Sequence, residues 1–165
     1  MENTENKQEM QHSKHAMYGR FAVMAVVMFI AMYLIMFAMI DRLQNLIPNI
    51  NNLYMTLLMV SVMILIELWM MKKMYTDSKL NLIIVVIAIV AGVFSWSGIR
   101  EQIYVGDKEF VKGMIPHHVA AVLMSEKTKL TDPELIELQK SILESQSKEI
   151  ELMRRKLSEF EKAGK

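Results

Sequence analysis

The sequence predicts an all-α membrane protein, with three transmembrane helices followed by an extracytoplasmic antiparallel helical hairpin. Hydrophobic residues make up 53% of the 165 residues, and most of them lie in three long apolar segments within residues 21–99. Residues 100–165 are rich in Lys and Glu and repeat apolar residues at spacings of three and four, which is typical of amphipathic helices. The absence of cysteine excludes disulfides, thiolate zinc sites and iron–sulfur clusters.

The distribution of charge gives no indication of a nucleic-acid partner. The formal net charge is +1, and the chain has no long run of Lys or Arg. Acidic and basic residues alternate through the C-terminal third. We therefore expect a membrane and other proteins, rather than nucleic acid, as partners.

Three segments are long and apolar enough to cross a membrane: residues 21–40, 53–71 and 80–99. Each has about 20 residues, the length that spans a hydrocarbon core of ~30 Å. The first is too long for a signal peptide and lacks a small-residue cleavage site, so we expect it to be a retained anchor. Residues 21–99 thus form a three-span membrane domain behind a polar tail of residues 1–20.

The basic residues of the short loops predict the orientation, because cytoplasmic loops carry an excess of Lys and Arg. The loop after the first span has only Arg42, next to Asp41. The tail and the second loop have three basic residues each: Lys7, Lys14 and Arg20, and Lys72, Lys73 and Lys79. We therefore expect a bacterial plasma-membrane protein with a cytoplasmic N-terminus and residues 100–165 in the periplasm or outside the cell.

The third span carries small residues on one face. Ala88 and Gly92 are four residues apart, and Ser95 follows one turn later. Such faces let helices approach closely, so this span is expected to pack against a neighbouring helix or a second copy.

Beyond Gly106 the sequence predicts two helices joined by a short turn. Asp107 is a candidate N-cap for the first helix. Thr131-Asp132-Pro133-Glu134 predicts a second start, with a capping residue, a proline in the first turn and a possible capping box. The apolar stripe of the second helix includes Leu135, Leu138, Ile142, Met153, Leu157 and Phe160.

Polar residues interrupt both stripes at similar heights in the predicted hairpin. His117 and His118 interrupt the first helix, and Gln146 and Glu149 interrupt the second. Burying such groups without partners costs a few kcal/mol each, so they should satisfy one another or a ligand. Two hypotheses follow: a metal-free hydrogen-bonded pair, or a metal site.

Three methionines, Met114, Met124 and Met153, lie near these histidines and add thioether sulfur to the two imidazole rings as metal donors. This soft ligand set favours Cu(I), with zinc as the alternative. Glu149 and Gln146 are expected to support the site, with Glu149 accepting a hydrogen bond that orients an imidazole. Pro116 predicts a kink that could turn both histidine rings toward one point.

The N-terminal tail repeats the same ligand types in a polar segment that we expect to be disordered. Its weaker metal candidates are Met10, His12, His15 and Met17. The charge rule places them on the opposite side of the membrane from the hairpin.

These residues resemble the family catalogued as domain of unknown function 305, in its membrane-anchored subset. The resemblance covers about residues 107–157, and the matching positions are Asp107, Phe110, Met114, His117, His118, Met124, Gln146, Glu149, Ile150 and Met153. It implies an exported ferritin-like bundle, some of whose members bind copper and confer copper tolerance. His117, His118, Met114 and Met124 would be the metal-binding set. This chain has one hairpin where longer members have two, so a second copy would complete a four-helix bundle as a homodimer.

The sequence therefore predicts a non-enzymatic, membrane-anchored protein for copper sequestration, handover or tolerance, with a copper transporter or metallochaperone as a possible partner. The alternative is a structural or accessory membrane protein whose hairpin mediates oligomerisation or partner binding. An enzyme is disfavoured because no Ser/His/Asp set or phosphate loop appears, and a di-iron bundle would need Glu where Met114 precedes His117.

Overall fold

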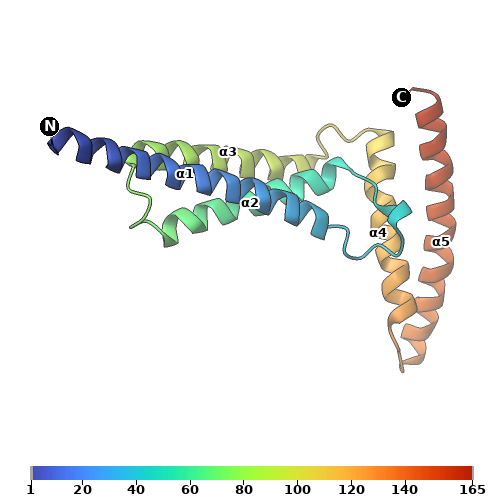
Figure 1. Ribbon diagram of the computed structural model, residues 1–165. Coiled ribbons are helices and arrows are strands. Elements are labelled where there is room, and N and C mark those ends of the chain that lie inside the picture. Colours follow the sequence, from blue (N-terminus) through green and yellow to red (C-terminus); the bar gives the residue numbers. More distant parts are fainter. Residues whose placement is uncertain (1, 165) are drawn as a thin grey trace. The chain divides into compact units, whose positions relative to one another are not determined.

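The structure, a computed structural model, describes the backbone of residues 2–164 and the side chains of residues 16–164. This described part contains helices and no strand, which confirms the predicted all-α class (Figure 1). Met10, His12 and His15, three of the weaker metal candidates, lie outside the described side chains. The elements are α1 (Glu2–Ile35), the 3₁₀ turn η1 (Leu43–Asn45), α2 (Ile50–Met70), α3 (Ser78–Glu101), α4 (Asp107–Lys127) and α5 (Pro133–Lys162).

Three helices are long and apolar enough to cross a membrane: Ala16–Ile35, Ile50–Met70 and Ser78–Glu101. They confirm the number and order of the predicted spans. Helix α1 differs from the first predicted segment at both ends, because it begins at Glu2, in the tail where we expected disorder, and ends at Ile35. Residues 36–39 form turns instead, and Phe37, at 5% exposure, is buried outside the helix. The apolar residues of this stretch therefore belong to a packed connecting segment and not to the helix.

The three apolar helices belong to one compact unit, made of residues up to Tyr33 and Tyr54–Glu101. The small residues of α3 contact α2, as the spacing predicted for a neighbouring helix. A Cβ added to Gly92 would lie 2.8 Å from Ser61 Oγ, and one added to Gly98 would lie 2.8 Å from the Tyr54 ring. A side chain at position 98 would therefore require the Tyr54 ring to shift.

The second compact unit consists of Leu34–Leu53 and the chain from Gln102 onward. Its centre is the predicted hairpin, in which α4 and α5 lie side by side and are joined by residues 128–132 (Figure 1). Asp132 caps α5 by accepting hydrogen bonds from the amides of Glu134 and Leu135, both at 3.0 Å. The buried core of the hairpin is Val111, Ile115, Val119 and Met153.

The segment between α1 and α2 covers part of the hairpin. Ile40 and Ile47 pack against the core cluster, and η1 contacts α4. Asn45 is completely buried, donates a hydrogen bond to Asp41 and accepts one from Arg154 of α5. This segment, which the sequence analysis considered only for its charge, therefore packs on the hairpin as a third layer.

This arrangement constrains the topology of the chain. The α1–α2 segment and the α4–α5 hairpin form one compact unit, so both must lie on the same side of any membrane that the apolar helices cross. Three crossings satisfy this requirement, because the first loop and the C-terminal region then emerge on the same face.

Candidate metal site

The site is built on α4, whose apolar residues face α5 and the α1–α2 segment. Val111, Ile115 and Val119 recur every four residues and are buried, with Ile115 fully inaccessible. Pro116 lies inside this helix without ending it. Asp107 is the first helical residue and Gly106 occupies the N-cap position without a side-chain hydrogen bond, so the predicted cap at Asp107 was wrong.

His118 lies at the α4–α5 interface. Its side chain is 15% exposed, and its Nδ1 lies 3.1 Å from Oε2 of Glu149, whose side chain is 48% exposed. The two atoms are close, but their alignment does not make a hydrogen bond, and Nδ1 is buried without a hydrogen-bond partner. The contact is thus a close approach without a hydrogen bond, and a small rotation of either side chain is needed before Glu149 can orient the imidazole.

Gln146 provides a second unsatisfied atom at the same interface. Its Oε1 is buried and has no hydrogen-bond partner among the described residues. Leaving a buried polar group unpaired costs about 1–3 kcal/mol. The two buried atoms, His118 Nδ1 and Gln146 Oε1, thus lie on facing helices, and Glu149 Oε2 lies 3.1 Å from the first of them.

Thioethers flank this place on both helices. Met114 lies one turn before His118, and Met153 lies one turn after Glu149, so each is a neighbour on its own helix surface. Met153 belongs to the buried core, and Met114 packs against that core. Imidazole nitrogen and thioether sulfur are donors that suit Cu(I).

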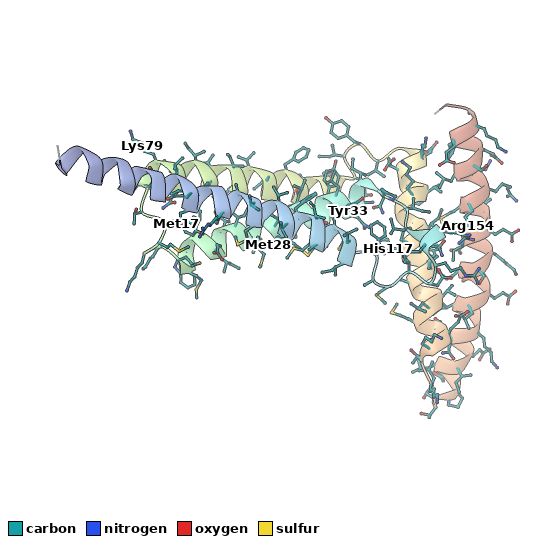
Figure 2. All side chains as sticks on the ribbon, viewed as in Figure 1. Met17, Met28, Tyr33, Lys79, His117 and Arg154 are labelled. Atoms are coloured by element: carbon teal, nitrogen blue, oxygen red, sulfur yellow. The ribbon has the colours of Figure 1, made fainter. Side chains whose placement is uncertain are left out.

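His117 does not join this group. It is exposed, like Met124 and Phe110, and lies on a different face of α4 from the buried residues (Figure 2). Successive residues of a helix differ by about 100° in direction, and Pro116 does not overcome this separation. The expectation that a kink turns both rings toward one point was therefore wrong. The structure divides the predicted ligands into an inner group near His118 and an outer group near His117.

The described side chains contain no group of three or more His, Cys, Asp or Glu residues placed to hold a metal ion.

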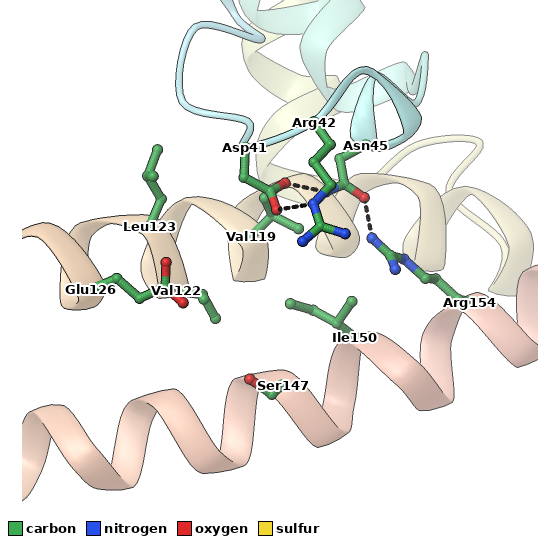
Figure 3. Close-up of a pocket in the computed structure, with 10 residues that line it drawn as sticks. All are labelled: Asp41, Arg42, Asn45, Val119, Val122, Leu123, Glu126, Ser147, Ile150 and Arg154. Atoms are coloured by element: carbon green, nitrogen blue, oxygen red, sulfur yellow. Dashed lines mark hydrogen bonds and ion pairs between the residues drawn. The ribbon is translucent and has the colours of Figure 1, made fainter.

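A cavity of about 250 Å³ lies elsewhere in the same unit, between the α1–α2 segment and the hairpin (Figure 3). It contains none of the predicted site residues. Apolar α4 residues and Ile150 of α5 form its floor, and Asp41, Arg42, Asn45 and Arg154 form its rim. Sequence reasoning missed Asn45 and Arg154. The only available signal was the uncharged polar stretch that includes Asn45, Asn49, Asn51 and Asn52.

The outer face of α5 is solvated and carries ion pairs. Hydrogen bonds from Lys148 and Lys156 hold the pKa values of Glu144 and Glu159 below their ordinary range. The Nζ–carboxylate distances are 2.6 and 2.7 Å. This face therefore needs no covering partner, in contrast to the inner face.

The fold and the site define an all-helical protein with three helices able to span a membrane and a His- and Met-bearing hairpin. A family model described as "Domain of unknown function (DUF305)" matches residues 100–157. An uncharacterized protein, L153, of Acanthamoeba polyphaga mimivirus is 37% identical over 113 residues, which are 67% of this chain and 72% of that protein. The chain belongs to the DUF305 family. No solved structure matches it.

Proposed function

We propose that this protein is a membrane-anchored metal-binding protein that sequesters Cu(I) or hands it to another copper-handling protein, such as a transporter or metallochaperone. The observation that supports the proposal is the placement of His118 at the hairpin interface, where its Nδ1 faces Oε2 of Glu149 at 3.1 Å and the buried thioether of Met153 lies one turn beyond Glu149 on α5. A soft metal held there would be bound by the imidazole of His118 and the thioether of Met153. Met114 lies at the border between the inner and outer groups and is available to either.

Glu149 supports the ligand rather than binding the ion. It faces Nδ1 of His118 at 3.1 Å, which leaves Nε2 as the nitrogen for a metal. A carboxylate that accepts the other N–H of a metal-binding imidazole fixes the ring and increases its basicity. A carboxylate oxygen is also a hard donor, which suits Cu(I) less well than sulfur or imidazole does.

The charge pattern supports an extracytoplasmic hairpin. Lys72, Lys73 and Lys79 lie around the α2–α3 loop, whereas the α1–α2 segment has a single arginine paired with Asp41. By the positive-inside rule, the α1–α2 segment and the hairpin lie outside the cytoplasm. A copper site in that position intercepts the metal before it enters the cell or after it leaves.

Copper titration of the full chain in detergent tests the proposal. Cu(I) is supplied under reducing conditions in competition with a coloured chelator, and Zn(II) is titrated separately. We expect His118→Ala to weaken Cu(I) binding at least tenfold and Met153→Leu, which keeps the volume and removes the sulfur, to weaken it measurably. The matched control Met59→Leu removes a thioether from α2 and should change nothing.

Two outcomes would contradict the proposal. Equal, weak Cu(I) binding by wild type and His118→Ala would leave the hairpin as a structural or accessory element, the alternative function. Tight Zn(II) binding that survives Met153→Leu would assign the site to zinc.

A further inference from the structure

A second cavity, distinct from the one in Figure 3, is enclosed by the α1–α2 segment and the hairpin. Its volume is about 550 Å³, within the range of sites that hold small organic ligands. Part of its wall comes from the α1–α2 segment: Gln44, Leu46, Ile47 and Pro48. The rest comes from α4 and α5 and includes two basic residues, Lys112 and Arg154. All of these residues belong to one compact unit, so the cavity is formed within a single folded body.

Arg154 is held at this cavity by an uncharged partner. It donates a hydrogen bond to Oδ1 of Asn45, which is fully buried and itself donates to Asp41 (Figure 3). None of the ion pairs among the described side chains includes Arg154. A guanidinium has five N–H donors, and the bond to Asn45 uses one of them. Arg154 therefore keeps its positive charge and most of its donors for a ligand, while a buried amide fixes its position.

Lys112 adds a second positive charge, from α4. Its side chain is 25% exposed, and its Nζ lies 2.6 Å from Oε1 of Glu109, which leaves two of the three ammonium donors for another acceptor. Glu161 is the acidic member of the cavity lining, and Ser158 adds a hydroxyl. With two basic residues and one acidic residue, the lining has a net charge of +1 and favours an anion.

The smaller cavity of Figure 3 has no such excess of positive charge. Its lining contains two carboxylates, Asp41 and Glu126, and two guanidinium groups, Arg42 and Arg154. Arg42 is already paired, with its Nε 3.6 Å from Oδ2 of Asp41. An anion in the smaller cavity would meet as many acidic as basic groups. The larger cavity is therefore the better anion site of the two that Arg154 lines.

The larger cavity also has an apolar part that lies close to a membrane span. Leu46, Ile47 and Pro48 contribute it from the α1–α2 segment, and Leu157 contributes from α5. Helix α2, which is long and apolar enough to cross a membrane, begins at Ile50, two residues after Pro48. Two residues span at most ~7 Å, about the thickness of one headgroup layer. In a membrane-inserted chain this end of the cavity therefore lies at the level of the lipid headgroups.

We infer that this cavity binds the phosphate group of an anionic phospholipid. Arg154 and Lys112 donate hydrogen bonds to the phosphate oxygens, whose geometry matches the planar fork of arginine. Leu46 and Leu157 contact the apolar chain next to the headgroup. Free phosphate has the same anionic chemistry but no apolar chain, so the apolar part of the wall favours the lipid. Such a lipid would tie the hairpin unit to the membrane surface, and its site is separate from the proposed copper site at His118.

Native mass spectrometry of the full chain in detergent tests this inference. The probes are dioctanoyl phosphatidylglycerol, dioctanoyl phosphatidylcholine and inorganic phosphate, each at the same concentration. We expect each chain to retain one phosphatidylglycerol and to retain phosphatidylcholine less well, because the choline cation opposes Arg154 and Lys112. Inorganic phosphate should not displace the phosphatidylglycerol, because it lacks the apolar chain.

Two substitutions with opposite expected effects separate a binding role from a structural one. Lys112→Gln, which leaves the Arg154–Asn45 bond intact, should lower the retention of phosphatidylglycerol about fivefold, the usual effect of one basic residue on an anionic lipid. Glu161→Gln should raise the retention, because it removes the acidic group from the lining. The matched control, Arg155→Gln, removes an exposed positive charge next to Arg154 on α5 and should change nothing.

Three outcomes would contradict the inference. Equal retention of the two phospholipids, unchanged in Lys112→Gln, would show adventitious lipid only. Displacement of phosphatidylglycerol by inorganic phosphate would overturn the lipid as the occupant and leave a site for free phosphate. Weaker retention in Glu161→Gln would contradict the charge assigned to the cavity. None of these results bears on copper binding at His118, and the copper titration does not bear on the lipid.

Discussion

His117 and His118 are adjacent in the sequence but have different environments. His118 lies at the α4–α5 interface against Glu149, whereas His117 is exposed on a different face of α4. The residue types were readable from the sequence, and so was the proximity of a histidine to Glu149. The sequence did not show that His117 and His118 have different environments, because this depends on which face of α4 the α1–α2 segment and α5 cover.

The role of Glu149 gives a prediction at this scale. Glu149→Gln removes the carboxylate charge and keeps the shape of the side chain. We expect it to weaken Cu(I) binding by about 10–100-fold, the usual effect of losing a carboxylate that orients a metal-binding imidazole. Glu151→Gln, an exposed neighbour on the same helix, is the control in the same chelator competition. Unchanged affinity in Glu149→Gln would remove Glu149 from the site.

At the scale of elements, the α4–α5 hairpin was predictable because its helices are amphipathic and its turn carries clear start signals. Asp132 is the N-cap and Pro133 the first helical residue, within the start that the sequence indicated, but Glu134 is then the second helical residue and does not complete the predicted capping box. The ends of α1 were not predictable from hydropathy. Phe37 and Ile40 look like span residues, yet they continue into a segment that packs within the hairpin unit.

The hairpin core predicts a large stability effect at one position. Ile115 is fully inaccessible and lies at the centre of the α4–α5 contact. Ile115→Ala should lower the stability of the hairpin by about 2–5 kcal/mol, because it removes buried methyl groups and leaves a cavity. Hydrogen exchange of α4 and α5 in the full chain measures this as faster exchange. Exchange unaltered from wild type would contradict the packing described here.

The α1–α2 segment predicts a second effect on exchange. Arg154 donates to the buried Asn45, and Asn45 donates to Asp41. Arg154→Leu leaves the Asn45 acceptor unpaired, which costs about 1–3 kcal/mol. We expect faster hydrogen exchange in residues 40–47 and little change in the far half of the hairpin. Arg155→Leu, on the exposed surface of α5, is the control.

At the scale of the whole molecule, connectivity determines which segments share a side of the membrane. The α1–α2 segment and the hairpin form one compact unit, and α2 and α3, each long and apolar enough to cross a membrane, connect the α2–α3 loop to that unit. Sequence patterns predicted three spans and their order, because long apolar helices are a strong signal. They did not predict that the first loop is part of the C-terminal unit, since its few apolar contacts have no periodicity.

Cysteine labelling in intact cells tests this topology. Leu43→Cys, at a position 85% exposed in the first loop, and Ser145→Cys on α5 should both react with a membrane-impermeant maleimide. Lys73→Cys, in the α2–α3 loop, should react only after the membrane is permeabilised. Labelling of Lys73→Cys from outside, with protection of the other two, would reverse the orientation. Different accessibility of Leu43→Cys and Ser145→Cys would contradict the shared unit itself.

The central claim, that the hairpin binds Cu(I) through imidazole and thioether ligands, is tested most directly by X-ray absorption at the copper edge. The sample is the full chain in detergent, loaded with one equivalent of Cu(I) under reducing conditions. We predict a first coordination shell that contains both sulfur and imidazole nitrogen, and loss of the imidazole contribution when His117 and His118 are both replaced by Ala. A shell of oxygen and nitrogen without sulfur, or a spectrum unchanged by the double substitution, would contradict the account.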